Sequence, residues 1–204
     1  MITSPLKNVV FVDWQNMYHN LWLQFKVKPY QVNVLTLLKE RVLDAGIVNP
    51  EFRFYTGIPD VNTDPVGHDS SQKFVDWLEH NGAKIWTRTL RSHIDEEGKL
   101  RRTEKGADVR LGCELVAMAV SGQLANAIIV SADQDLSESV SVAKMMTRSL
   151  KMPDVQYHTI KMGELSRGIN GTNWLALTQD AVLDSQVKRV EELVARKPRV
   201  ESER

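Results

Sequence analysis

The stretch Asn8-Val9-Val10-Phe11-Val12-Asp13 decides the fold, and Trp14-Gln15-Asn16-Met17-Tyr18 follows it directly. Four consecutive apolar residues that are branched or aromatic are typical of a strand buried on both faces of a parallel sheet. Beyond Asp13 the apolar residues recur at helical spacing. Because the carboxyl ends of strands in an open α/β sheet face the ligand crevice, we expect the Asp13 side chain to point into a cleft. The alternative is that Asp13 only caps the helix that follows.

The rest of the chain alternates between strand and helix patterns. Further strands are predicted at residues 52–56, 83–90, 126–131 and 155–159, and helices at 32–43, 69–81, 105–121 and 133–150. Residues 59–67 are expected to form a loop, and a long charged loop follows the third strand. This alternation predicts an α/β fold in which a mainly parallel five-stranded sheet is flanked by helices on both faces.

The C-terminal part of the chain has a different pattern. We divide the sequence into a domain of residues 1–179 and a segment of residues 180–204, which is expected to form an amphipathic helix and a charged tail. The apolar stripe of this helix consists of Val182, Leu183, Val187, Val190, Leu193 and Val194. Such a stripe indicates docking on the body of the domain, with a homodimer through the helix as the alternative.

Composition limits the class of protein. Lysine plus arginine and aspartate plus glutamate number 26 each, so a polyanionic partner would have to be bound by a local basic patch or by metal ions. The single cysteine, Cys113, excludes an internal disulfide and a multi-cysteine zinc site. The sequence has no apolar run of membrane length and no signal-peptide pattern. We therefore expect a soluble, cytoplasmic protein without a membrane partner.

Three carboxylates distant in the sequence are predicted to lie at the ligand side of the sheet. Asp13 ends the first strand, Asp133 follows the fourth, and Asp108 opens a helix behind Gly106; Asp135 is a candidate fourth. Helix capping alone, including a capping box of Ser131 and Gln134, would contribute about 0.5–2 kcal/mol. Two carboxylates about 4 Å apart repel by about 4 kcal/mol at an effective dielectric constant near 20. A hard cation such as Mg²⁺ or Mn²⁺ relieves this repulsion, so a convergent cluster would favour metal binding over capping.

Three motifs together resemble the NYN domain. They are Phe11-Val12-Asp13-x-Gln15-Asn16-x-Tyr18, Glu104-Lys105-Gly106-x-Asp108-Val109 and Ile129-Val130-Ser131-x-Asp133-x-Asp135-Leu136, and the similarity extends over roughly residues 8–159. NYN domains form a branch of the PIN-like metal-dependent ribonucleases that includes the LabA-like (DUF88) proteins. The resemblance implies a three-layer PIN-like fold with adjacent first and fourth strands, and a Mg²⁺ or Mn²⁺ site at their ends.

The resemblance also assigns roles to residues. It implies that Asp13, Asp108 and Asp133 are metal ligands and that Asn16, Ser131 and Asp135 orient ligands, waters or a second ion. Together with Lys105, which is placed to contact a phosphate or leaving group, these residues form the predicted catalytic set. This sequence departs from the usual pattern at Trp14, Arg110, Ala132 and Leu136, but no departure removes a carboxylate.

Contacts to RNA, single-stranded or structured, are predicted at the charged loop before Asp108 and at Trp14 beside the cleft. The charged loop contains Arg88, Arg91, Lys99, Arg101, Arg102 and Lys105, which would guide a phosphate backbone, although a merely solvated loop is the alternative. Trp14 would stack on a base, or else pack against a neighbouring helix. The predicted nucleic-acid contacts are Trp14, Ser131, Arg101, Arg102 and Lys105.

The sequence thus predicts a metal-dependent ribonuclease that hydrolyses phosphodiester bonds. A catalytically inactive RNA-binding or regulatory module of the same fold is the alternative. A phospho-aspartyl hydrolase is less favoured, because position 15 is Gln15 and the Asp-x-Asp pattern is therefore missing at the first strand.

Overall fold

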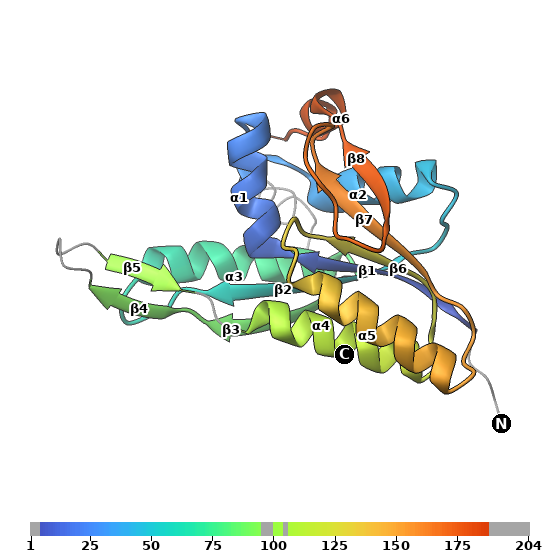
Figure 1. Cartoon of the computed structure of the whole chain (residues 1–204). Coiled ribbons are helices and arrows are strands. Elements are labelled where there is room, and N and C mark those ends of the chain that lie inside the picture. The colour runs from blue at the N-terminus through green and yellow to red at the C-terminus, as the bar shows by residue number, and fades with distance from the viewer. Residues whose placement is uncertain (1–4, 95–99, 104–105, 188–204) are drawn as a thin grey trace, which may run out of the picture.

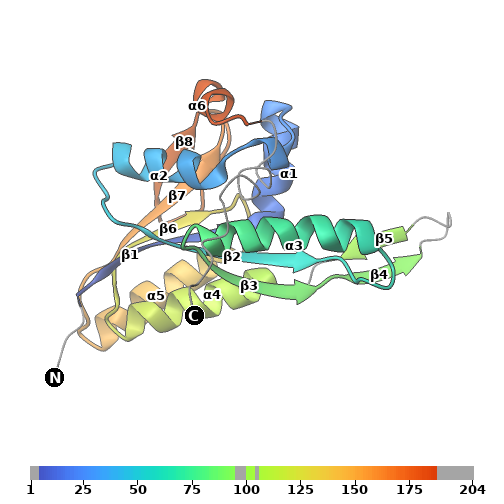
Figure 2. The ribbon, with the colours of Figure 1, turned by 180° about the vertical axis from the view of Figure 1, so that it is seen from behind.

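A computed structural model describes residues 5–94, 100–103 and 106–187, which form an α/β fold built on a six-stranded parallel sheet (Figures 1 and 2). The strand order is β3-β2-β1-β6-β7-β8, and every neighbouring pair is parallel. The strands are β1 (Lys7–Asp13), β2 (Glu51–Ile58), β3 (Lys84–Thr89), β6 (Leu124–Val130), β7 (Gln156–Met162) and β8 (Asn173–Leu177). The helices are α1 (Trp14–Phe25), η1 (Pro29–Gln31), α2 (Val34–Asp44), α3 (Pro65–His80), α4 (Ala107–Val120), α5 (Leu136–Ser149) and α6 (Gln179–Asp184), with η1 a 3₁₀ helix.

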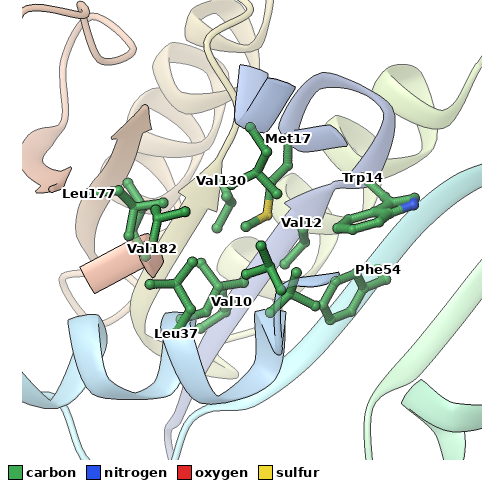
Figure 3. Close-up of a cluster of buried hydrophobic side chains, with 14 of the residues drawn as sticks. Val10, Val12, Trp14, Met17, Leu37, Phe54, Val130, Leu177 and Val182 are labelled. Atoms are coloured by element: carbon green, nitrogen blue, oxygen red, sulfur yellow. The ribbon is translucent and has the colours of Figure 1, made fainter. Parts of the chain in front are cut away.

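The central strand β1 divides the core into two layers. Val10 and Val12 contact the layer formed by α1, α2, α3 and α6, whereas Val9 and Phe11 contact the layer formed by α4 and α5. All four side chains are completely buried, because successive residues of a strand point to opposite faces and helices cover both faces. Figure 3 shows the first layer, in which Val10 and Val12 lie among Met17, Leu37 and Val182. Burying each such side chain contributes about 1.5–3 kcal/mol.

The α/β class and the parallel sheet are confirmed, but the strand count differs from the prediction. The additional strand is β8, a five-residue edge strand whose first two residues are exposed. Its sequence, Asn-Trp-Leu-Ala-Leu, has an apolar run but no β-branched residue, and only Leu177 is buried. The β-branched runs that identified the central strands are therefore absent at this edge.

The charged loop after β3 contains an antiparallel hairpin that the sequence did not predict. It consists of β4 (Arg91–Ile94) and β5 (Leu100–Thr103), paired from Arg91 with Thr103 to Ile94 with Leu100. Its strands have the sequences Arg-Ser-His-Ile and Leu-Arg-Arg-Thr, which contain no apolar run. An apolar pattern could therefore not have revealed it.

Among the helix starts, those of α3 and α5 differ most from the prediction, and α3 shows why. It begins at Pro65 rather than near residue 69, because the Asp64 side chain accepts a hydrogen bond from the Gly67 N–H (3.0 Å) and Pro65 occupies the first helical turn. The second difference is α5, which begins at Leu136 after a turn rather than at residue 133.

The start of the C-terminal segment belongs to the body of the domain. Helix α6 begins at Gln179, and its Val182 is completely buried in the same layer as Leu177. The Val187 N–H then donates to the Gln31 carbonyl oxygen (2.7 Å). The remaining stripe residues Val190, Leu193 and Val194 and the charged tail lie outside the described residues. The separate C-terminal helix and the homodimer therefore stay predictions.

An ion cluster joins three strands at the amino edge of the sheet. Glu51 at the start of β2 pairs with Arg53 (2.5 Å), with Lys84 of β3 (3.1 Å) and with Lys7 of β1 (3.3 Å). Arg53 also pairs with Glu114 of α4. Burial opposes ionisation of Glu51, but the hydrogen bonds from Lys84 and Arg53 outweigh it and lower the pKa of Glu51 to about 2.

Replacing Glu51 with glutamine should therefore cost stability in a pH-dependent way. The folded-state pKa lies below the ordinary value of 4.5, so the stabilisation is complete above that pH and is lost as the pH falls toward 2. Urea denaturation should show a loss on the order of 1–3 kcal/mol for Glu51→Gln at pH 7, and little difference from wild type at pH 2. Glu40→Gln on the exposed face of α2 is the control. A Glu51→Gln loss of the same size at both pH values would contradict the assignment.

Candidate functional site

Asp13 ends β1 and caps α1 with one carboxylate oxygen only. Its Oδ1 accepts a hydrogen bond from the Asn16 N–H (3.1 Å), while Oδ2 accepts one from the Ser131 hydroxyl (3.1 Å). The side chain is buried, with 8% of the residue exposed. The capping interpretation is thus correct for one oxygen, and the second oxygen joins Asp13 to the end of β6.

The ends of β1 and β6 are held together by two side chains. Ser131 is completely buried; its hydroxyl donates to Asp13 and accepts the Asp133 N–H (3.1 Å). The Asn16 Oδ1 accepts the Ala132 N–H (2.9 Å) and a hydrogen bond from the Asn20 side chain (3.0 Å). The predicted adjacency of the first and fourth strands is confirmed by this pairing of β1 with β6. A single hydroxyl group therefore connects Asp13 with the backbone of Asp133.

A short turn after β6 places Asp133 and Asp135 ahead of α5. The Asp133 Oδ1 accepts the Asp135 N–H (3.0 Å), and Asp133 is half-buried whereas Asp135 is exposed. Gln134 does not complete a capping box with Ser131. Its amide donates to the Gly168 carbonyl (3.0 Å) and accepts the Asn170 N–H (3.3 Å), so that the segment before β8 is attached to this turn.

The start of α4 supplies the third predicted carboxylate and an arginine. Asp108 lies in the first turn, is half-buried, and accepts a hydrogen bond from the Val109 N–H (2.8 Å). Gly106 precedes the helix with a φ of 102°, and a Cβ atom there would lie 2.9 Å from the Nη1 of Arg88. Arg88 pairs in register with Gly57 near the carboxyl end of β2. The start of α4 and an exposed guanidinium group thus lie at the same edge of the sheet as Asp13.

The three predicted metal ligands do not form a closed carboxylate cage. Among the described residues, no group of three or more histidine, cysteine, aspartate or glutamate side chains is placed to hold a metal ion. Asp13 and Asp133 nevertheless offer hard oxygen donors at neighbouring strand ends. This suits Mg²⁺, which often takes one or two carboxylates and completes its coordination with waters and substrate phosphates. The assignment of Asp13, Asp108 and Asp133 as ligands stays a prediction.

The predicted nucleic-acid contacts fall into two groups. Trp14 is 7% exposed and stacks on Phe74 with a ring separation of 4.5 Å, which favours packing over an open stacking face. Ser131 has no exposed surface, so in this conformation it orients Asp13 rather than presenting itself to RNA. The backbone of Arg101 and Arg102 lies in β5, whereas their side chains and the whole of Lys105 lie outside the described structure.

Two supporting residues were not assigned a role from the sequence. Asn20 holds the Asn16 side chain, and the Gln15 amide donates to the Gly57 carbonyl of β2 (3.2 Å). Both are polar residues on the first turns of a helix that buries Trp14, Met17 and Leu21. Their position beside the motif aspartate is the signal that would have identified them.

Comparison with protein families agrees with this arrangement. Residues 7–151, the larger part of the chain, match the family model described as the NYN domain. The chain belongs to the NYN domain family. NYN domains are part of the PIN-like nuclease superfamily, which points to a nuclease. Membership in the LabA-like branch stays a prediction.

A solved structure supports the fold of this NYN domain. The crystal structure of a protein of unknown function, VPA0982 from Vibrio parahaemolyticus, aligns with a TM-score of 0.52 and 17% sequence identity, covering 88% of this chain and 98% of that one. No curated protein gives a significant match. Within the described residues no helix has the length and apolar character needed to span a membrane.

The hydroxyl of Ser131 should contribute measurably to stability. Ser131→Ala removes the donor to Asp13 and the acceptor for the Asp133 N–H, and the buried groups left behind cost about 1–3 kcal/mol in the free energy of unfolding. Ser141→Ala, an exposed position on α5, should change it by less than about 0.5 kcal/mol. Equal values for the two variants in chemical denaturation would show that the junction adds nothing to stability.

Proposed function

We propose that this NYN domain is a metal-dependent ribonuclease that hydrolyses RNA phosphodiester bonds at the carboxyl edge of its sheet. The observation that carries the proposal is the hydrogen-bonded junction of β1 and β6. It fixes Asp13 and the backbone of Asp133, which are 120 positions apart in the sequence, at neighbouring strand ends. Asp13, Asp108 and Asp133 are the proposed metal ligands, with Mg²⁺ or Mn²⁺ as the ion.

The geometry of Asp13 supports a role beyond capping. A cap needs one acceptor oxygen, yet the second oxygen is held by a neutral hydroxyl from another strand. These two hydrogen bonds orient the Asp13 carboxylate at the strand end, and an oriented carboxylate is a suitable ligand for a hard cation. The bound ion would supply charge neutralisation on the phosphoryl oxygens and activation of water.

Other side chains at this edge would position the substrate. The Asn16 Oδ1 takes two hydrogen bonds, and its Nδ2 donates none among the described residues, which leaves it for a water or a phosphate oxygen. Asp135 is exposed and would orient a water, and Ser131 keeps Asp13 in place. We propose Lys105 as the phosphate contact. Arg88, close to Gly106, adds a described cation at this edge.

RNA would reach the site along the β4–β5 hairpin. The chain has no net charge, so attraction of a polyanion must come from a local concentration of basic residues. Arg101 and Arg102 lie on β5, immediately ahead of α4 in the chain. In the proposal, these two residues guide the RNA backbone toward Asp108.

A catalytically inactive RNA-binding module is the second candidate. The observation in its favour is that the described residues contain no group of three acidic or histidine side chains able to hold an ion. An enzyme and a binder respond differently to loss of a carboxylate, and Asp133 offers the cleanest test. Asparagine keeps the size of the side chain and the oxygen that accepts the Asp135 N–H.

Asp133→Asn should abolish hydrolysis while sparing RNA binding. We expect cleavage in Mn²⁺ to fall by at least about a hundredfold, as for loss of one electrostatic stabiliser of a transition state. RNA affinity in EDTA should stay the same or rise slightly, because a negative charge near the phosphate is removed. Mn²⁺ should raise the melting temperature of wild type but not of the variant.

Asp154→Asn is the matched control, because Asp154 is exposed and precedes β7 at the opposite edge of the sheet. It should cleave like wild type. If wild type cleaves no RNA with either metal, the binding module is the correct function. If Asp133→Asn cleaves as well as wild type, Asp133 is not part of the active site.

Replacing Arg101, Arg102 and Lys105 with alanine should weaken RNA binding and reduce its dependence on salt, because fewer counterions are released on binding. The slope of log affinity against log salt should fall by up to about 3 for three lost phosphate contacts. Replacing Lys26, Lys28 and Lys39, which are exposed near η1 and α2, is the control of equal charge. Equal slopes for the two triple variants would identify the hairpin as a merely solvated surface.

A further inference from the structure

A pocket of about 420 Å³ opens between α1 and α3, beside the carboxyl ends of β1 and β2. Its volume lies in the range of small-ligand sites, and its walls combine aromatic rings with a few polar groups. The lining residues include Trp14, Gln15, Tyr18, Thr56, Ser71 and Phe74. The proposed hydrolysis does not use this pocket.

The pocket lies beside the end of β1, where Asp13 is located. Trp14 and Gln15 follow Asp13 in the chain, and Asp13 pairs in register with Tyr55, the neighbour of Thr56. The Gln15 amide bridges from α1 to β2 through its hydrogen bond to the Gly57 carbonyl. An RNA strand with one phosphate at Asp13 would therefore present the base of an adjacent nucleotide to the pocket.

Two polar groups of the pocket have no partner among the described residues. Trp14 is more than nine-tenths buried, yet its Nε1–H donates no hydrogen bond; Figure 3 shows this nitrogen at the end of the ring that points away from Val12 and Met17. The Gln15 Oε1 likewise accepts none, since both recorded bonds of this amide involve Nε2. The Trp14 Nε1–H is accessible at the pocket surface, where a ligand can accept a hydrogen bond from it.

The charge of the pocket selects a neutral occupant. Within the described structure its lining contains no lysine, arginine or histidine, and its one carboxylate, Asp64, caps α3 through the Gly67 N–H. A phosphate would find no cation here, whereas a flat heteroaromatic ring would find aromatic walls, a donor and an acceptor. Tyr18 is 44% exposed, and it meets the Trp14 ring edge to face (5.9 Å), which leaves much of its own ring open to a ligand.

We propose that this pocket binds one unpaired nucleobase of a single-stranded RNA, with Tyr18 as a stacking surface and the Trp14 Nε1–H and Gln15 Oε1 facing the base edge. The inference rests on the proposed function, because it places the base next to the phosphate at Asp13. Sequence-tolerant stacking on aromatic rings is a common way to hold single strands, and a base must leave its helical stack to enter such a pocket. The site would therefore select unpaired RNA over duplex.

The test is a double-mutant cycle in EDTA, which measures binding without cleavage. Fluorescence anisotropy compares a single-stranded RNA of about ten nucleotides with a ribose-phosphate strand of equal length that lacks bases. Tyr18→Ala should weaken binding of the RNA about tenfold, as expected for one lost stacking contact, and leave the baseless strand unchanged. His19→Ala, the exposed neighbour on α1, should affect neither.

A second variant fills the pocket instead of opening it. Ser71→Phe on α3 should occlude the base and weaken RNA binding similarly, with circular dichroism and melting temperature reporting an intact fold. Equal losses for RNA and the baseless strand, or no loss with either variant, would overturn the proposal. A third outcome would assign the pocket to free nucleotides and would also overturn the proposal. In that case the protein binds adenosine 5′-monophosphate more tightly than ribose 5-phosphate, Tyr18→Ala removes this preference, and RNA binding is unchanged.

These results are separate from those for hydrolysis. If the protein cleaves no RNA but binds it in a base-dependent way, the proposed base pocket is retained and the proposed nuclease activity is rejected. If Asp133→Asn abolishes cleavage, while Tyr18→Ala and Ser71→Phe change neither cleavage nor base-independent binding, the nuclease activity is retained and the base pocket is rejected.

Discussion

The junction between the ends of β1 and β6 is the constraint on which the rest of the structure depends. Both strands are buried on two faces, so their polar groups can reach water only at the strand ends. At the carboxyl ends, the Ser131 hydroxyl and the Asn16 amide satisfy the Asp13 carboxylate and the Ala132 N–H across the strand boundary. The same contacts fix where α1 begins and where the turn before α5 lies. A site at this edge is therefore a consequence of how the central strands end.

The two edges of the sheet use charge differently. At the amino edge, Glu51 is neutralised by Arg53, Lys84 and Lys7, so that opposite charges pair within the protein. At the carboxyl edge, Asp13 accepts hydrogen bonds from the Asn16 N–H and the Ser131 hydroxyl, and Asp133 accepts one from a backbone N–H. Paired charges stabilise the fold, whereas carboxylates oriented at strand ends are suited to a cation brought from solution. The contrast supports placing the function at the carboxyl edge.

How much the sequence predicted depended on the signal each element carries. Continuous apolar runs identified β1 and β6, because central strands must be apolar on both faces. The motif resemblance predicted that these two strands are adjacent, as they are. The edge strand β8 and the hairpin β4–β5 were missed, because β8 has no β-branched residue and the hairpin strands contain no apolar run. The motif residues Asp13, Asn16 and Ser131 were predicted to act together, and their hydrogen bonds bring them together. The role of Gln15 and the pocket beside Trp14 could not be predicted, because they depend on how α1 and α3 pack.

The pocket and the acidic junction arise from the same two turns of α1. Asp13, which caps this helix, and its residues Asn16 and Asn20 contribute to the junction, while Trp14, Gln15 and Tyr18 line the pocket. Residues three or four apart share one side of a helix, so a single rigid element would present the proposed phosphate site and the proposed base site in a fixed relation. A nucleotide carries its phosphate and its base in a similarly fixed relation through the ribose. Matching the two on one helix would position the scissile bond without requiring any sequence-specific contact.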